Sequence, residues 1–381
     1  MSNNLHHIAI VGAGLIGRLS ALWLSRAGYQ ITLIDKDTKE GKQSAAYAAA
    51  GLLTPLGESL HCEPNIVEMG FESIHLWPSL LDSLDGYTYF QQEGAIMVSH
   101  EQDQGDYLRF VRHLKQHYPE HGVHQLNRSQ LLELEPELGR SFRGGLYLPQ
   151  EGQVGNRKLL IALQEALSDS SVNWLEEHTV HSIDASDSGA RIVAGNQTVL
   201  ADLVIDCRGY GAASSQTYSK ALSDLRAVRG DLFQLFAPDV NLSRPIRLMH
   251  PRYQLYIAPK TKGFYVVGAT EIESDDTSEM TVRSAMELLS AAYSVHPGFA
   301  EANIRQHVTQ LRPAFSDNQP KINVQSRLIQ VNGLYRHGYL ISPVVLKQVL
   351  ALVNEMNGTD GNFRSDANLP YSHWLPIKEL S

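Results

Sequence analysis

Residues 7–35, HIAIVGAGLIGRLSALWLSRAGYQITLID, decide the fold of this chain. An apolar run rich in β-branched residues, 7–11, ends in a glycine cluster, and helical periodicity over 18–27 stops at a glycine. A second apolar run, 31–34, ends at Asp35. Strand, turn, helix and strand within roughly thirty residues form the first unit of a doubly wound parallel sheet. We therefore predict an α/β fold whose first sheet starts near the N-terminus.

The turn of this unit carries the pattern G-x-G-x-x-G, formed by Gly12, Gly14 and Gly17. Glycines at this spacing allow a tight turn, close approach of a pyrophosphate and close packing of helix on strand. The anion then binds the free N–H groups of the helix, and Asp35 at the end of the next strand can accept hydrogen bonds from a ribose. The loop predicts a dinucleotide. It leaves FAD and NAD open, and Lys36 beside Asp35 would also suit a 2′-phosphate.

Length and composition narrow the class of protein. At 381 residues the chain exceeds the size at which one core usually keeps growing, so we expect two packed domains. Asp and Glu number 41 against 32 Lys and Arg, and this acidic balance argues against nucleic acid as a partner. Cys62 and Cys207 lack the CxxC spacing of metal and redox sites, which fits a reducing compartment. With neither a basic leader nor about 18 consecutive apolar residues, we predict a cytoplasmic protein without a membrane span.

Beyond residue 35 the periodicity changes. Helices are predicted at 71–84, 156–167, 282–293, 299–307 and 344–354. Apolar and polar residues alternate, as antiparallel strands do, at 232–235, 253–258 and 264–267. These strands indicate a second sheet, separate from the first.

Several unlike motifs then follow one another in a definite order. They are AAYAAAGLLTP (45–55), GQVGNRKLL (152–160), ADLVIDCRGYGA (201–212), LYIAPKTKGFYVVGATE (255–271), QLRPAFSDNQP (310–320) and LYRHGYLISP (334–343). Their order resembles the D-amino-acid oxidase and glycine oxidase family of flavoproteins over nearly the whole chain. The resemblance implies a Rossmann-like FAD-binding domain and a second α+β substrate domain on a mainly antiparallel sheet. The expected limits are 1–84, 150–222 and 310–381 for the first domain, and 85–149 and 223–309 for the second.

The same resemblance implies one FAD per chain and assigns its contacts by position. For the ADP half it implies Gly12, Gly14, Leu15, Ile16, Gly17, Asp35, Lys36 and the backbone of Val180, and it implies Gly209 as a further FAD contact. Alongside the isoalloxazine it implies Ala45, Ala46, Ala50, Gly51, Leu52 and the segment Tyr335, Arg336, His337, Gly338, Tyr339 and Leu340. A helix expected to start near Pro343 would favour negative charge on the reduced ring. Because neither cysteine falls in the segment where some relatives attach flavin, we expect non-covalent FAD.

On the substrate side the resemblance implies Tyr256, Arg312 and Arg336 as catalytic residues, with Arg336 pairing with the substrate carboxylate. A guanidinium presents a rigid fork that binds a carboxylate bidentately. Without the resemblance, each arginine would read as a solvated surface charge and Tyr256 as a packing residue. The implied reaction is hydride transfer from the α-carbon of glycine or a small amine or amino acid to flavin, with O2 as acceptor. No general base is required.

Two alternatives stay open at this point. Leu52 replaces a methionine common in glycine oxidases, and Glu271 stands where an apolar residue can occur. Because of these departures, a second function stays open: a flavoprotein that oxidises or hydroxylates a side chain of a partner protein, as in the maturation of a protein-derived quinone cofactor of an amine oxidase. A non-catalytic flavin-binding assembly factor is the third reading, and it predicts that Arg312→Ala and Arg336→Ala leave the cellular role intact. A homo-oligomer is also left open.

One histidine-rich stretch, 111–126, places His113 and His117 on one helical face at the spacing that metal ligands use. Pro119 breaks the helix directly afterwards, and no nearby Cys or HExxH pattern supports a closed site. We predict no metal here.

Overall fold

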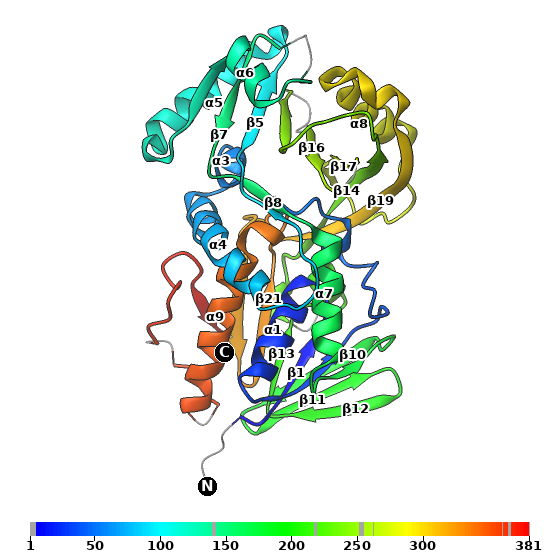
Figure 1. Cartoon of the computed structure of the whole chain (residues 1–381). Coiled ribbons are helices and arrows are strands. Elements are labelled where there is room, and N and C mark those ends of the chain that lie inside the picture. The colour runs from blue at the N-terminus through cyan, green and yellow to red at the C-terminus, as the bar shows by residue number, and fades with distance from the viewer. Residues whose placement is uncertain are drawn as a thin grey trace.

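The computed structural model describes residues 5–138, 142–216, 219–250, 255–261, 263–359, 361–364 and 367–380. Two sheets organise the molecule, one above the other in Figure 1. The lower part holds a seven-stranded sheet and the N-terminus, and the upper part holds a nine-stranded sheet. Short strands and the ends of longer ones join the two parts.

The lower sheet is the one predicted from residues 7–35. From one edge to the other its strands are β9 (Asn173–Leu175), β2 (Gln30–Ile34), β1 (His7–Val11), β13 (Leu203–Asp206), β21 (Leu328–Asn332), β20 (Lys321–Gln325) and β22 (Ile377–Glu379). The five strands from β9 to β21 are parallel, and β20 runs antiparallel to β21. A parallel sheet buried on both faces requires apolar residues on both sides of each strand, which explains the unbroken run of β1.

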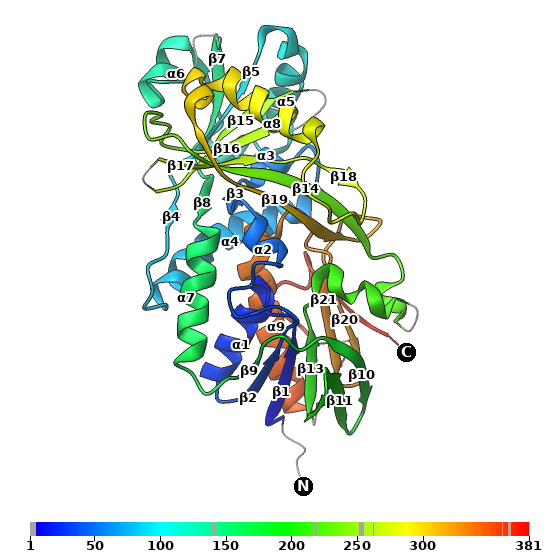
Figure 2. The ribbon, with the colours of Figure 1, turned by 90° about the vertical axis from the view of Figure 1, so that its right-hand side faces the viewer.

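The two faces of this sheet are covered differently. Ile8 and Ile10 of β1 pack with the helices α1 (Leu15–Arg26), α7 (Asn156–Ser168) and α9 (Gly338–Gly358). Ala9 and Val11 point the other way and pack against the small antiparallel sheet β10 (Val180–Ser186), β11 (Gly189–Ala194) and β12 (Gln197–Ala201). Figure 2 shows this small sheet beside β1 and β13. Helices therefore cover one face and strands cover the other.

The upper sheet is mainly antiparallel, as expected. Along it lie β18 (Ile272–Glu273), β14 (Arg226–Phe236), β17 (Phe264–Gly268), β16 (Leu255–Pro259), β15 (Ile246–Met249), β5 (Ala95–Ser99), β7 (Gly144–Leu148) and β6 (His124–Asn127), and β19 (Asn303–Ala314) also pairs with β14. The helices of this part are α5 (Gln104–His117), α6 (Arg128–Leu134) and α8 (Val282–Val295). One pair, β15 with β5, is parallel.

Short elements connect the two parts. The strands β3 (Leu52–Leu53), β8 (Gly152–Val154) and β4 (Phe90–Gln91) form a small sheet of their own. The helices α2 (Ala45–Ala48), α3 (Pro55–Glu58) and α4 (Pro64–Asp82) follow the second strand of the lower sheet. Single 3-10 turns lie at Glu101–Asp103, Pro119–His121, Gly209–Ser215, Lys220–Leu222 and Pro297–Glu301. The domain limits given above stay a prediction, and the limit between 309 and 310 falls inside β19.

Several predicted elements differ from the structure in kind or in extent. The helix predicted at 299–307 is a 3-10 turn followed by the start of β19, because pairing with β14 overrides the local helical pattern. The helix predicted at 71–84 begins seven residues earlier, at Pro64, where proline suits a first turn. For the strand predicted at 253–258, residues 253 and 254 lie outside the described residues, and β16 runs on to Pro259.

The last helix begins earlier than predicted, at Gly338 rather than near Pro343. A proline inside a helix removes one N–H and leaves the carbonyl four residues before it without its helical partner. In α9 that carbonyl belongs to Tyr339, and Trp77 of α4 donates to it through Nε1 at 3.1 Å. The indole thus replaces the lost hydrogen bond, and the helix continues through the proline.

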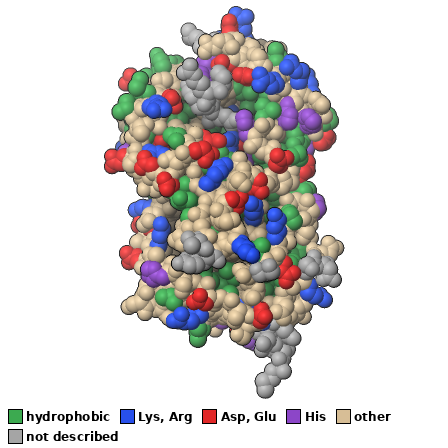
Figure 3. Space-filling model, turned by 180° about the vertical axis from the view of Figure 1, so that it is seen from behind, with side chains coloured by type: hydrophobic (Ala, Val, Ile, Leu, Met, Phe, Trp, Pro, Cys, Tyr) green, Lys and Arg blue, Asp and Glu red, His purple; other side chains and the backbone are tan. Residues whose placement is uncertain are grey.

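By length and composition α9 would suffice to cross a membrane, and it is the one such helix found among the described residues. Most of its apolar window, 72%, is buried inside the molecule. It packs against α1 and α4 in the core of the lower part. On the face opposite to that of Figure 1, acidic and basic side chains are interspersed (Figure 3).

Candidate functional site

A cavity of about 1870 Å³ is lined by residues from both parts of the molecule. Nearly all predicted site residues border it. These are Gly12, Gly14, Leu15, Ile16, Asp35, Lys36, Ala45, Ala46, Ala50, Gly51, Leu52, Gly209, Tyr256, Arg312, Tyr335, Arg336, His337, Gly338, Tyr339 and Leu340. The remaining two, Gly17 and Val180, lie outside its lining. Segments far apart in the sequence therefore meet at one site.

Backbone geometry explains the three glycines of the first loop. Gly12 has φ +101°, and a Cβ there would lie 2.7 Å from the carbonyl oxygen of Cys207 at the end of β13. A Cβ on Gly17 would overlap the carbonyl oxygen of Gly12, so this glycine lets α1 pack closely on the strand. Gly14 caps α1, and a Cβ there would meet open space. The first turn of α1 thus faces the cavity with its backbone amides exposed to a ligand.

Asp35 and Arg18 hold this loop in place. The carboxylate of Asp35 accepts hydrogen bonds from the backbone N–H of Ala13 and, at 2.8 Å, of Asp37, while burial raises its pKa. Arg18 is fully buried and donates to the carbonyls of Ala13 (2.8 Å), Leu160 (2.9 Å) and Lys39 (2.7 Å). Burial lowers the pKa of Arg18 to about 10, so it keeps its charge at neutral pH. Sequence analysis did not single out Arg18.

The small residues of 45–52 form a second wall. Gly51 has φ +69°, and a Cβ there would overlap the carbonyl oxygen of Val154 in β8. Lys260, at the end of β16, reaches this wall from the upper sheet and donates to Ala50 O at 2.7 Å, Gln153 Oε1 at 2.8 Å and Val154 O at 3.2 Å. Burial lowers the pKa of Lys260 to about 7. When protonated, the ammonium can donate one hydrogen bond to each of these three oxygens, which fixes the backbone beside the cavity.

The segment 335–340 forms the turn that opens α9. Tyr335 adopts φ +50°, and its N–H donates to Pro313 O at 2.9 Å. His337 is 2% exposed, and burial lowers its pKa to about 4, so its ring is neutral at pH 7. Its buried Nδ1 has no hydrogen-bond partner among the described residues. Gly338 follows, with open space where a Cβ would stand. This helix end borders the cavity with free backbone amides and an unpartnered ring nitrogen.

Arg336 is held between two carboxylates. Its Nη2 lies 2.6 Å from Glu58 Oε2, and its Nη1 lies 2.8 Å from Glu271 Oε2. Glu58 also pairs with Arg247, whose Nη1 lies 2.7 Å from Glu58 Oε1, and Glu271 accepts the hydroxyl of Tyr335 at 2.6 Å. Burial alone would raise the pKa of Glu58, but the two guanidiniums lower it far below its usual range. We call Glu58, Arg247, Glu271, Tyr335 and Arg336 the charged wall.

Arg312 differs from Arg336 in its partners. It donates through Nη1 to two backbone carbonyls, of Thr270 at 3.1 Å and Arg229 at 3.4 Å. Within the described parts of the chain no carboxylate forms an ion pair with it. Tyr256 stands nearby, with its hydroxyl against the backbone of Gly268, and burial raises the pKa of its phenol. A positive charge and a protonated phenol therefore border the cavity together.

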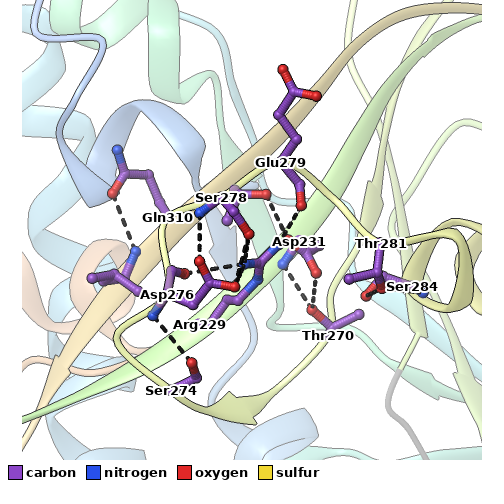
Figure 4. Close-up of polar contacts among 12 residues, drawn as sticks. Arg229, Asp231, Thr270, Ser274, Asp276, Ser278, Glu279, Thr281, Ser284 and Gln310 are labelled. Carbon is purple, nitrogen blue, oxygen red and sulfur yellow. Dashed lines mark hydrogen bonds and ion pairs between the residues drawn. The ribbon is translucent and has the colours of Figure 1, made fainter.

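The loop that follows β17 is anchored from below by Arg229 and Asp231 of β14 (Figure 4). Arg229, 3% exposed, donates to Asp231 Oδ1 at 3.2 Å, Asp276 Oδ2 at 2.9 Å and the carbonyl of Glu279 at 2.9 Å. The backbone N–H of Asp231 donates to Thr270 Oγ1 at 2.8 Å, and that of Thr270 donates to Asp231 O at 3.1 Å. The loop 270–279 is therefore fixed at its start and near its end.

One further carboxyl lies behind the charged wall. Glu151 is fully buried, and its Oε1 accepts the backbone N–H of Gly57 in α3 at 2.7 Å. Its Oε2 has no hydrogen-bond partner among the described residues. Burial raises the pKa of Glu151 to about 8, which keeps it protonated and uncharged at pH 7.

Cys207, His113 and His117 were among the residues considered for covalent or metal chemistry. Cys207 borders the cavity at the Gly12 loop, and burial raises the pKa of its thiol, which disfavours the nucleophilic thiolate. His113 and His117 lie with ring centroids 4.9 Å apart on α5. Across the described ranges no group of three or more His, Cys, Asp or Glu side chains is arranged to hold a metal ion.

Sequence analysis missed several residues of this site. Glu58, Arg247, Arg229 and Glu151 are ionisable residues with 12% or less of the side chain exposed. For Glu58 a signal exists: it is the first charge after the apolar stretch AAYAAAGLLTPLG. A charge inside such a stretch indicates a paired, buried group. Val180, whose backbone was predicted to contact adenine, packs its side chain in the cluster that also holds Val11 and Ile34, and the backbone contact stays a prediction.

The residues present fit a flavin dinucleotide. The cavity has a glycine cradle with the N-terminus of α1 at one end. It also has the N-terminus of α9 with the orphan Nδ1 of His337, and a wall of small residues. The first cradle suits a pyrophosphate, and the second suits negative charge on a reduced ring.

Comparison with known proteins agrees with this geometry. The model of the DAO family, FAD dependent oxidoreductase, matches residues 7–351. The putative thiamine biosynthesis oxidoreductase ThiO of Rhizobium etli is 34% identical over 342 residues, covering 90% of this chain and 94% of that protein. The glycine oxidase of Geobacillus kaustophilus is 26% identical over 360 residues, covering 91% of this chain and 93% of that protein. The crystal structure of glycine oxidase from the same species superposes with a TM-score of 0.82 at 23% identity, over 99% of this chain and 100% of that one.

Proposed function

Because this chain belongs to the DAO family of FAD-dependent oxidoreductases, we propose that it oxidises glycine or another small amine or amino acid at the α-carbon, with O2 as acceptor. The observation that carries the proposal is Arg312, a guanidinium at the cavity with no ion-pair partner among the described residues. Such a group is suited to the carboxylate of an amino acid. Arg336, for which this role was predicted, is already paired with Glu58 and Glu271.

Binding and orientation are the main tasks of the protein in this reaction. Arg312 holds the substrate carboxylate, and the protonated phenol of Tyr256 donates one further hydrogen bond. When bound, FAD supplies the two-electron acceptor for a hydride that leaves the α-carbon of the neutral amine. The first amides of α9 favour negative charge at their end of the cavity. The imine formed is hydrolysed by water to a carbonyl compound and ammonia, or to a primary amine where the substrate is secondary, as sarcosine is. The two electrons and two protons removed from the substrate reduce O2 to hydrogen peroxide.

Anaerobic mixing of the flavin-loaded protein with glycine, sarcosine and D-alanine tests the proposal. The visible absorbance of the flavin is expected to bleach with at least one of them, and air should then restore it and yield hydrogen peroxide. An unchanged spectrum with every small amine would reject the proposal. It would favour instead the oxidation of a side chain on a partner protein.

The Rhizobium etli relative is named for thiamine biosynthesis, and we propose that this chain also acts in thiamine biosynthesis. A Rhizobium etli strain lacking that relative should grow without added thiamine when it expresses this chain, and should fail to do so with the Arg312→Met variant. Equal growth with both proteins would contradict a role for amine oxidation in this setting. The cytoplasmic location and the individual FAD contacts stay predictions.

A further inference from the structure

Glu271 is a charged residue of the cavity that the proposed reaction does not use. Its carboxylate borders the cavity together with Arg312, Tyr256 and Arg336. It is engaged on both oxygens, by Tyr335 at Oε1 (2.6 Å) and by Arg336 at Oε2 (2.8 Å). Burial alone would raise the pKa of Glu271, but Arg336 lowers it, so the group is ionised at neutral pH.

The backbone holds Glu271 at this place. Thr270, the residue before it, is bonded through its backbone and its hydroxyl to the fully buried Asp231. Asp231 in turn is held by Arg229, which also ties down Asp276 farther along the same loop (Figure 4). A side chain on an anchored loop, with both oxygens bonded, presents its negative charge at a defined position.

The charges of the wall can be counted among the described residues. Arg247 and Arg336 are matched by Glu58 and Glu271, and Glu151 behind them is uncharged at pH 7. Arg312 adds one positive charge without a carboxylate partner. Among these groups one guanidinium, that of Arg312, is left for one carboxylate, and a second carboxylate entering beside it would meet Glu271.

We propose that Glu271 restricts the site to substrates with a single carboxylate and excludes dicarboxylic amines such as iminodiacetate. Glu271 occupies the guanidinium of Arg336 that a second carboxylate would need, and it repels that carboxylate at short range. This inference rests on the proposed function for the identity of the substrate class. The repulsion between Glu271 and a second carboxylate affects ligand binding, and ligand binding can be measured without turnover.

The test compares one-carboxylate and two-carboxylate ligands in the flavin-loaded wild type and in Glu271→Gln. Acetate and malonate are titrated, and dissociation constants are taken from the change in the visible flavin spectrum. Glu271→Gln is expected to bind malonate about tenfold or more tightly than wild type does, with acetate unchanged within about threefold. Turnover should follow binding, so that kcat/KM for iminodiacetate rises relative to that for glycine.

Glu273→Gln is the matched control, because Glu273 lies two residues farther along the loop, pairs with Arg226 and is 66% exposed. It should behave as wild type. An unchanged ratio of malonate to acetate affinity in Glu271→Gln would overturn the inference, as would an equal gain for both ligands, which would mean simple competition for Arg336. Failure of acetate to bind either protein, or of malonate to bind Glu271→Gln, would also overturn it. If both amines fail to reduce the flavin while the binding ratio shifts as expected, only the proposed reaction is rejected.

Discussion

The two ends of the cavity are built by different means. At the Gly12 loop the site is made from backbone, with a positive φ, amides at the start of α1 and carbonyls pinned by one buried arginine. At the charged wall it is made from side chains, with Glu58 and Arg336 contributed by segments nearly 280 residues apart. A backbone site depends on space and dihedral angles, whereas a charged wall depends on each charge keeping its partner. The two ends should therefore fail in different ways when they are altered.

Gly12→Ala should have the largest effect, because it adds an atom 2.7 Å from Cys207 O at a residue with φ +101°. We expect the protein to lose its flavin, with affinity for FAD at least about 100-fold weaker. Gly28→Ala is the control, since Gly28 has nearly the same dihedral, φ +97°, but open space around a Cβ. It should cost only about 1–2 kcal/mol of stability and retain flavin. The ratio of flavin to protein absorbance after gel filtration measures both, and a fully yellow Gly12→Ala protein would contradict the backbone account.

Glu58→Gln should be next in size, because it leaves Arg247 and Arg336 without a shared counter-charge. Breaking a buried ion pair from one side typically costs about 3–5 kcal/mol, measurable here by urea unfolding at pH 7. The pKa of Glu58 is lower in the folded protein than its ordinary 4.5, so its stabilisation is present above pH 4.5 and is lost as pH falls. The gap between wild type and variant should therefore shrink at acid pH. Glu63→Gln, an exposed change in the same region, should show no gap, and a gap independent of pH for Glu58→Gln would argue against the ion pairs.

Arg312→Met removes the guanidinium beside the charged wall that has no carboxylate partner among the described residues and is proposed to bind the substrate. Losing a bidentate charge-assisted contact should lower kcat/KM for glycine by about 100-fold, since hydrogen bonds to charged groups are each worth about 1.5–3 kcal/mol. Arg305→Met, an exposed change on the same strand, should leave kcat/KM unaltered. An equal kcat/KM for Arg312→Met and wild type would mean that another residue binds the substrate carboxylate.

Glu151→Gln should have the smallest effect, and with the opposite sign. Burial raises the pKa of Glu151 from 4.5 to about 8, so between these values the folded state keeps a proton that the unfolded state releases. This carboxyl thus lowers stability progressively as pH rises through that window. Glutamine cannot ionise, and we expect Glu151→Gln to be more stable than wild type by about 1–2 kcal/mol at pH 8.5 and equal to it near pH 4. Thermal unfolding at the two pH values measures this, with exposed Glu133→Gln as the control.

The same contrast explains what could be predicted from the sequence. The Gly12 loop and Asp35 are local, so their spacing predicts both their geometry and their ligand class. Arg312 and Tyr256 could be predicted only from the order of the motifs along the whole chain. The pairing of Arg336 with Glu58 and Glu271 could not be predicted, because it depends on α3, the loop after β17 and the turn before α9 meeting in space. The helix predicted at 299–307 failed for the same reason, since its partner strand β14 lies about seventy residues earlier.

The ladder between β14 and β19 also bears on how the molecule can move. The two strands pair from Arg226 with Ala314 to Phe236 with Asn303, with one irregularity near Gln234. One end of this ribbon lies beside the cavity at Arg312, and the other end reaches into the upper part beside α8 (Figure 2). A hinge across it would have to break consecutive interstrand hydrogen bonds. We therefore expect the two parts to keep a fixed relative orientation. Ligands should then enter when surface loops are displaced, and not when one part rotates away from the other.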